Sequence, residues 1–143
     1  MQHTFVSLLL AIGMSLALQT VQAQYKSAPE GARAYIIAPQ NGAVVPSTFV
    51  VKFGLHGMGV APAGIQAENT GHHHLLIDVE DMPDMSKPLP ATDHIVHFGG
   101  GQTETTISLE PGEHTLQLVL GNFAHIPHDP AVVSKTITVY VKE

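Results

Sequence analysis

The chain of 143 residues contains no cysteine, and this absence excludes several kinds of site at once. A disulfide framework, a cysteine-ligated zinc site, an iron–sulfur cluster and a cysteine nucleophile all need that side chain. A blue-copper electron-transfer site is excluded as well, because its short copper–thiolate bond requires a cysteine. A metal ion bound to this chain must therefore take its ligands from imidazole, carboxylate and thioether groups.

Positive charge is also scarce, with six Lys and Arg against twelve Asp and Glu, for a formal net charge of −6. Nucleic-acid binding needs clustered Lys and Arg to neutralise phosphates, so the composition argues against a nucleic-acid partner. Hydrophobic residues make up 44% of the chain, which is too many for a disordered protein. The one residue type in clear excess is histidine, with ten copies.

The N-terminal segment has the pattern of a secretory signal peptide. Residues 5–18 are apolar apart from Ser7, Gly13 and Ser15, and they carry no charge, a run of about 14 residues that is too short to span a bilayer. Val21 and Ala23 provide small residues at the −3 and −1 positions of a cleavage site. We therefore expect a signal peptide over residues 1–23, a periplasmic or secreted protein, and no membrane span after cleavage. The alternative is an uncleaved membrane anchor.

The remaining chain has the pattern of an all-β domain. A flexible lead-in over residues 24–33 is expected to precede a domain over residues 34–143. Within this domain, short runs rich in Val, Ile, Thr, Phe and Tyr are separated by Gly and Pro clusters, without a helical period. This pattern predicts an immunoglobulin-like antiparallel β-sandwich of about seven strands. The expected strands, A to G, are 34–38, 49–55, 73–80, 95–98, 103–109, 114–120 and 132–141.

Most of the histidines fall near one predicted end of this sandwich. The B–C, D–E and F–G connections emerge together in such folds, and seven histidines lie in or beside them. Imidazole suits zinc and copper, so these residues predict a transition-metal site, with a solvated histidine patch as the alternative. The first-choice ligands are His72, His74, His125 and His128, with His97 and His56 in reserve.

The alternation of side chains along a strand separates the three consecutive histidines. His72 and His74 share one face at a spacing of about 6.5–7 Å, which allows both imidazoles to close on one ion. His73 points with Leu75 and Ile77 toward the core, where we expect it to be buried and hydrogen-bonded.

Three other features have structural interpretations. His114 follows the Pro111 turn, at the corner where many sandwiches place an aromatic residue that bonds back to the backbone, so a structural role is expected. Met82 and Met85 resemble a copper(I) methionine pair, but their loop is predicted at the opposite end, where packing is the simpler explanation. Loosely spaced acidic residues, including Asp78, are expected to be solvated surface.

Four segments carry a resemblance to a known family. They are residues 54–64 (GLHGMGVAPAG), 69–78 (NTGHHHLLID), 97–104 (HFGGGQTE) and 111–118 (PGEHTLQL). The chain resembles a family of small secreted bacterial domains, number forty-three ninety-nine in the domain-of-unknown-function series. The resemblance covers about residues 35–141 and supports the fold and the compartment, but it implies no activity.

Three functions fit these observations. The leading hypothesis is a periplasmic copper or zinc carrier or buffer that is not an enzyme. The second is an envelope interaction module that binds another protein or a glycan through its histidine-rich loops. The third is a metal-dependent enzyme, which would need a general base beside an open coordination position. No Gly-x-Ser-x-Gly nucleophile motif occurs in the sequence.

Overall fold

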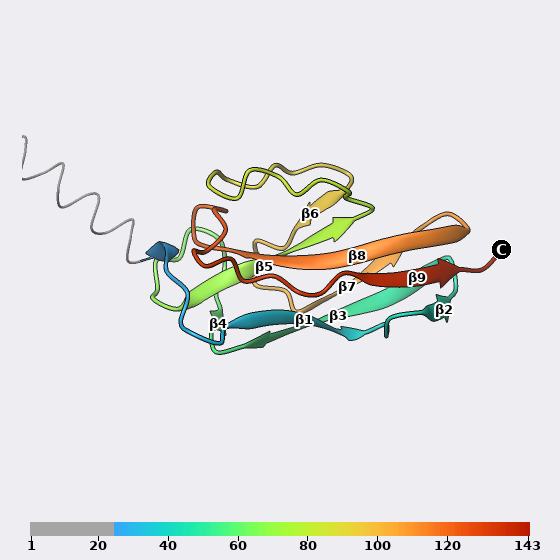
Figure 1. Ribbon diagram of the computed structural model, residues 1–143, viewed down its shortest axis with the longest axis horizontal. Coiled ribbons are helices and arrows are strands. Elements are labelled where there is room, and N and C mark those ends of the chain that lie inside the picture. The colour runs from blue at the N-terminus through green and yellow to red at the C-terminus, as the bar shows by residue number, and fades with distance from the viewer. Residues whose placement is uncertain (1–24) are drawn as a thin grey trace, which may run out of the picture.

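The protein is a sandwich of two β-sheets, as Figure 1 shows for the computed structural model. The structure describes residues 25–143, and the predicted signal peptide lies outside them. One sheet has the order β1-β3-β7, and the other has the order β2-β9-β8-β5-β4, with β6 also paired to β5. The strands are β1 (Arg33–Ala38), β2 (Ala43–Val45), β3 (Thr48–His56), β4 (Gly59–Val60), β5 (Thr70–Ile77), β6 (Ile95–His97), β7 (Glu104–Ser108), β8 (Gly112–Gly121) and β9 (Ile137–Val141).

This topology confirms the predicted all-β, immunoglobulin-like sandwich. The predicted strand D, residues 95–98, corresponds to β6. This strand pairs with β5 in the larger sheet and not with the strands of the β1-β3-β7 sheet. It therefore occupies the C′ position of immunoglobulin folds. The short strands β2 and β4 were not predicted, since runs of three and two residues carry too little pattern.

The hydrophobic core lies between the two sheets. Val51 from one sheet packs with Leu75, Leu118 and Val139 from the other, and all four side chains are fully buried. Burial of such a side chain stabilises a fold by about 1.5–3 kcal/mol. This core accounts for the alternating apolar residues that predicted the strands.

Strand β5 is buried on both faces, which alternation alone did not predict. Its outer face is covered by residues 78–94, which run back over the sheet (Figure 1). A second apolar cluster of Leu76, Leu89, Ile95 and Val119 forms beneath this segment, and Met85 packs against it. The loop of Met82 and Met85 therefore runs back over the sheet and does not stay at the far end, where it was expected. Met85 has the packing role that the sequence predicted.

The connections at the histidine end are bonded to one another. The amide of Ala63 donates to the carbonyl of Gly99 at 2.8 Å, and the amide of Gly64 donates to the carbonyl of Phe123 at 2.9 Å. Residues 25–32, within the expected lead-in, also contact this end, where the amide of Asp129 donates to the carbonyl of Lys26 at 2.8 Å. Within residues 25–143, no helix is long and apolar enough to cross a membrane.

His114 forms the expected corner. Its Nε2 lies 2.9 Å from the carbonyl oxygen of Glu110, and its Nδ1 lies 2.7 Å from a carboxylate oxygen of Asp78. Asp78 has a positive φ of 54° that ends β5, and it also accepts a hydrogen bond from the amide of Thr115 at 2.8 Å. Asp78 is therefore a structural anchor and not merely solvated surface, which corrects the expectation for this residue.

His73 packs in the core as predicted, but it is not hydrogen-bonded. Its ring lies 5.2 Å from the ring of Phe53, and no group among residues 25–143 hydrogen-bonds either ring nitrogen. Burial lowers the pKa of His73 to about 4, because the apolar surroundings disfavour the charged form. The expectation of a satisfied imidazole is wrong because the ring faces the apolar core beside Phe53, where no side-chain partner meets it.

We predict that His114→Phe lowers the free energy of unfolding by about 1–2 kcal/mol at pH 6, because two hydrogen bonds are lost. The hydrogen bond to Asp78 raises the pKa of His114. The contribution of the pair is therefore complete below pH 6.5, the ordinary value, and is lost as pH rises through the raised pKa. Urea unfolding from pH 5.5 to 9 measures this, and equal destabilisation at both ends would contradict it.

We predict that His73→Leu raises the free energy of unfolding of the metal-free protein by about 1–3 kcal/mol at pH 7, because an unpartnered buried polar group is removed. The lowered pKa of His73 makes the folded state lose stability as pH falls from 6.5 toward 4, since the unfolded chain is protonated first. The variant should show a shallower decline over this range. A loss of stability at pH 7 would mean that the ring has a partner, such as an internal water.

Candidate metal centre

Four histidines converge at one end of the sandwich. The possible ligand nitrogens of His72, His74, His97 and His125 all lie within 4.8 Å of one another. Two of these residues come from β5, one from the end of β6 and one from the loop that follows β8. The predicted convergence of histidines is therefore present for these four.

Strand pairing accounts for three of the four positions. His72 and His74 project from the same face of β5, and their ring centroids lie 4.9 Å apart. His97 of β6 is the direct cross-strand partner of His74, so its ring stacks on that of His74 at 5.1 Å. This contact exists because β6 joins the sheet of β5.

Glycines make room for the imidazoles. A Cβ atom at Gly121, which faces His72 across the β5–β8 pair, would lie 2.7 Å from the Cε1 atom of His74. A Cβ atom at Gly99 would lie 2.5 Å from the Cε1 atom of His97. Both distances are shorter than any normal contact, so a side chain at either position would displace an imidazole of the cluster.

The cluster has a buried floor and an accessible rim. His72 and His74 are fully buried, whereas His125 is half-buried and His97 is exposed. The Nε2 of His72 lies 3.1 Å from the Nδ1 of His125, where one nitrogen donates and the other accepts. Within the described part of the chain, Nδ1 of His72 and both nitrogens of His74 have no hydrogen-bond partner. Buried unpartnered nitrogens are costly, so an additional ligand for them is expected at this point.

Burial and mutual repulsion keep the buried imidazoles uncharged. Burial lowers the pKa of His72 to about 4, with further lowering by positive charge on His125 and His97. The pKa of His74 falls to about 3, first from burial and then from repulsion by His72 and His97. Burial also lowers the pKa of His97. Because only neutral imidazole binds a metal ion, these shifts remove proton competition at neutral pH.

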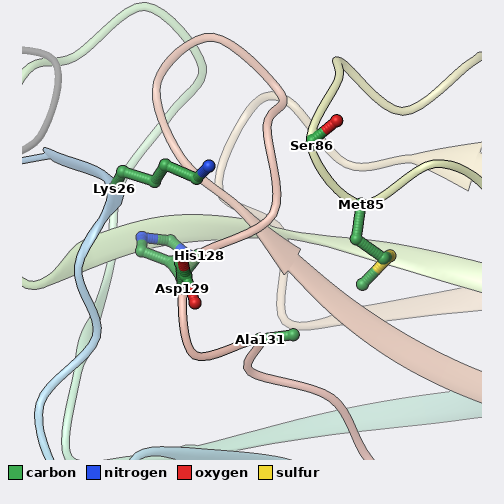
Figure 2. A pocket seen from close by; sticks show the side chains of 6 residues that line it. All are labelled: Lys26, Met85, Ser86, His128, Asp129 and Ala131. Atoms are coloured by element: carbon green, nitrogen blue, oxygen red, sulfur yellow. The ribbon is translucent and has the colours of Figure 1, made fainter.

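Two of the proposed ligands lie elsewhere. His128 is buried, and its Nε2 and Nδ1 lie 3.2 and 3.4 Å from the carbonyl oxygens of Thr70 and Leu120. It lines a separate cavity of about 240 Å³, shown in Figure 2, together with Lys26, Met85, Ser86, Asp129 and Ala131. His56 is exposed at the end of β3 in the other sheet. Loop position alone did not distinguish His125 from His128, because both follow β8 within a few residues.

Comparison with known proteins gives structural neighbours of low similarity. An endo-beta-1,4-mannanase from Thermotoga petrophila is 15% identical, with a TM-score of 0.45, over 80% of this chain and 20% of the mannanase chain. The fibronectin(III)-like modules of Clostridium thermocellum CbhA are 11% identical, with a TM-score of 0.37, over 77% of this chain and 45% of that chain. This chain thus spans a fifth of the mannanase chain and less than half of the CbhA chain. A search of curated protein sequences finds no match.

The sequence comparison with protein families is more informative. The family described as "Domain of unknown function (DUF4399)" matches residues 51–142, which include all four clustered histidines. This match covers well over half of the chain and agrees with the resemblance noted from the motifs. The chain therefore belongs to the DUF4399 family.

Proposed function

We propose that this protein binds a divalent zinc or copper ion through His72, His74, His97 and His125, as a carrier or buffer in the periplasm or outside the cell. The observation that carries the proposal is the convergence of four imidazoles whose buried nitrogens have no other partner within residues 25–143. In a solvated histidine patch, by contrast, the rings would point apart and bond to water.

The spacing of the four nitrogens supports a four-coordinate ion. A tetrahedral zinc ion with Zn–N bonds of about 2.0–2.1 Å places its ligand atoms about 3.3 Å apart. The four nitrogens already lie within 4.8 Å of one another, so small side-chain rotations would complete the site. Rearrangement of the strands is not required.

The donor set favours borderline divalent ions. All four donors are imidazoles, which suit Zn²⁺ and Cu²⁺. Magnesium and calcium prefer carboxylate and carbonyl oxygens, and copper(I) prefers thiolate and thioether sulfur. A site of this composition is therefore selective against both groups of ions.

The exposure of the rim supports a carrier or buffer. His97 is exposed and His125 is half-buried, so an ion can enter or leave past these two residues while the buried pair stays in place. The hydrophobic core lies between the sheets and forms without the cluster. The signal-like N-terminal sequence supports action outside the cytoplasm.

We predict that the metal-free protein, prepared with a chelator, binds one Zn²⁺ or Cu²⁺ per chain in isothermal titration. The double variant His72→Ala/His74→Ala should bind at least about 100-fold more weakly, a loss of about 2.8 kcal/mol, because the two fixed ligands are absent. His56→Ala is the matched control and should bind as the parent does. Affinity weaker than about millimolar in the parent, or an unchanged affinity in the double variant, would overturn the proposal.

A further inference from the structure

His125 differs from the other three clustered histidines because no strand holds it. It lies in the loop after β8, and its backbone has a positive φ of 64°. This left-handed conformation costs a non-glycine residue about 1–2 kcal/mol, so the surrounding structure must impose it. Its imidazole nevertheless lies 3.1 Å from that of His72, within the cluster.

The side chain of Asn122 organises the turn that presents His125. Asn122 is only 4% exposed, and its Oδ1 accepts hydrogen bonds from the amides of Ala124 at 2.9 Å and Ile126 at 3.1 Å. These two amides flank His125 on either side. The backbone carbonyl of Asn122 also accepts a hydrogen bond from the amide of His125 at 2.9 Å. The Asn122 side chain thus fixes the peptide groups 123–124 and 125–126, and its backbone carbonyl fixes the peptide group between them.

The segment of residues 78–94, which covers β5, also holds the backbone of His125. The amide of Leu89, whose side chain is buried in the second apolar cluster, donates to the carbonyl of His125 at 2.9 Å. Both backbone polar groups of His125 are therefore bonded, one within its own turn and one to the segment over β5. The backbone that carries the imidazole is therefore held by hydrogen bonds that need no ion.

We propose that Asn122 is the positioning residue of the metal site, which pre-organises His125 as the fourth ligand. This inference rests on the proposed function. Asn122 acts only through the loop, because its Oδ1 accepts hydrogen bonds from two backbone amides. The loop is then already ordered, so binding of an ion does not carry the entropic cost of ordering it. Without this side chain the other three ligands, which strands hold, stay in place.

The test compares zinc affinity in three variants. Asn122→Ala should weaken Zn²⁺ binding about 10- to 100-fold, as is typical when a group that orients a ligand is lost. Asn122→Asp keeps the accepting oxygen and should retain the affinity of the parent. Asn41→Ala is the matched control, because Asn41 Oδ1 likewise accepts a backbone amide, that of Thr138 at 2.9 Å, next to β9. It should leave the affinity unchanged.

A double-mutant cycle separates positioning from a general loss of structure. In a His125→Ala background, Asn122→Ala should cause no further loss of zinc affinity, because the ligand that it positions is already absent. An additive loss in the double variant, or full affinity in Asn122→Ala, would overturn the inference. If Asn122→Ala does not fold, Asn122→Ser replaces it in the same cycle, since a serine hydroxyl bonds such backbone amides more weakly.

A metal-free measurement distinguishes failure of this inference from failure of the proposed function. If the parent binds no zinc, the proposed function fails, but ring-nitrogen NMR can still report the contact between His72 and His125. Asn122→Ala should abolish the signals of that contact, whereas Asn122→Asp and Asn41→Ala should retain them. Unchanged signals in Asn122→Ala would overturn the positioning role whether or not the parent binds a metal.

Discussion

The structure depends on the burial of β5 on both of its faces. A strand at the centre of a sandwich normally packs one face on the core and turns the other toward water. Here the core between the sheets buries the inner face, while residues 78–94 and the other clustered histidines cover the outer face, so every residue from Gly71 to Ile77 is buried. Three consecutive imidazoles are therefore held away from water, where a polar group without a partner is costly.

Alternation along β5 gives these imidazoles two different outcomes. His73 points into the core between the sheets and loses the hydrogen bonds that it would have in water. His72 and His74 point outward, where His97 and His125 meet them, so their nitrogens share one small volume. One polar side chain thus weakens the fold, whereas the outward pair, at a similar cost of burial, forms a site that an ion can satisfy.

Local pattern was sufficient for the sandwich, for the shared face of His72 and His74 and for the core position of His73, because each follows from the period of a strand. It was insufficient for His97, whose place in the cluster depends on the pairing of β6 with β5. It was also insufficient to separate His125 from His128, because a left-handed residue and the hydrogen bonds of Asn122 decide which ring enters the cluster. The return of residues 78–94 over the sheet likewise depends on distant contacts, such as that of Leu89 with Val119.

The separation of the core from the cluster bears on how an ion would affect the protein. Val51, Leu118 and Val139 are fully buried between the sheets, so the sandwich has its hydrophobic driving force without any metal. In zinc fingers, by contrast, binding of the ion drives folding, so removal of the ion unfolds the domain. In this chain the ion would add stability only through its preference for the folded state, and the amount would depend on its free concentration. An ion that entered or left past the exposed rim would therefore leave the fold intact, as the proposed carrier or buffer role requires.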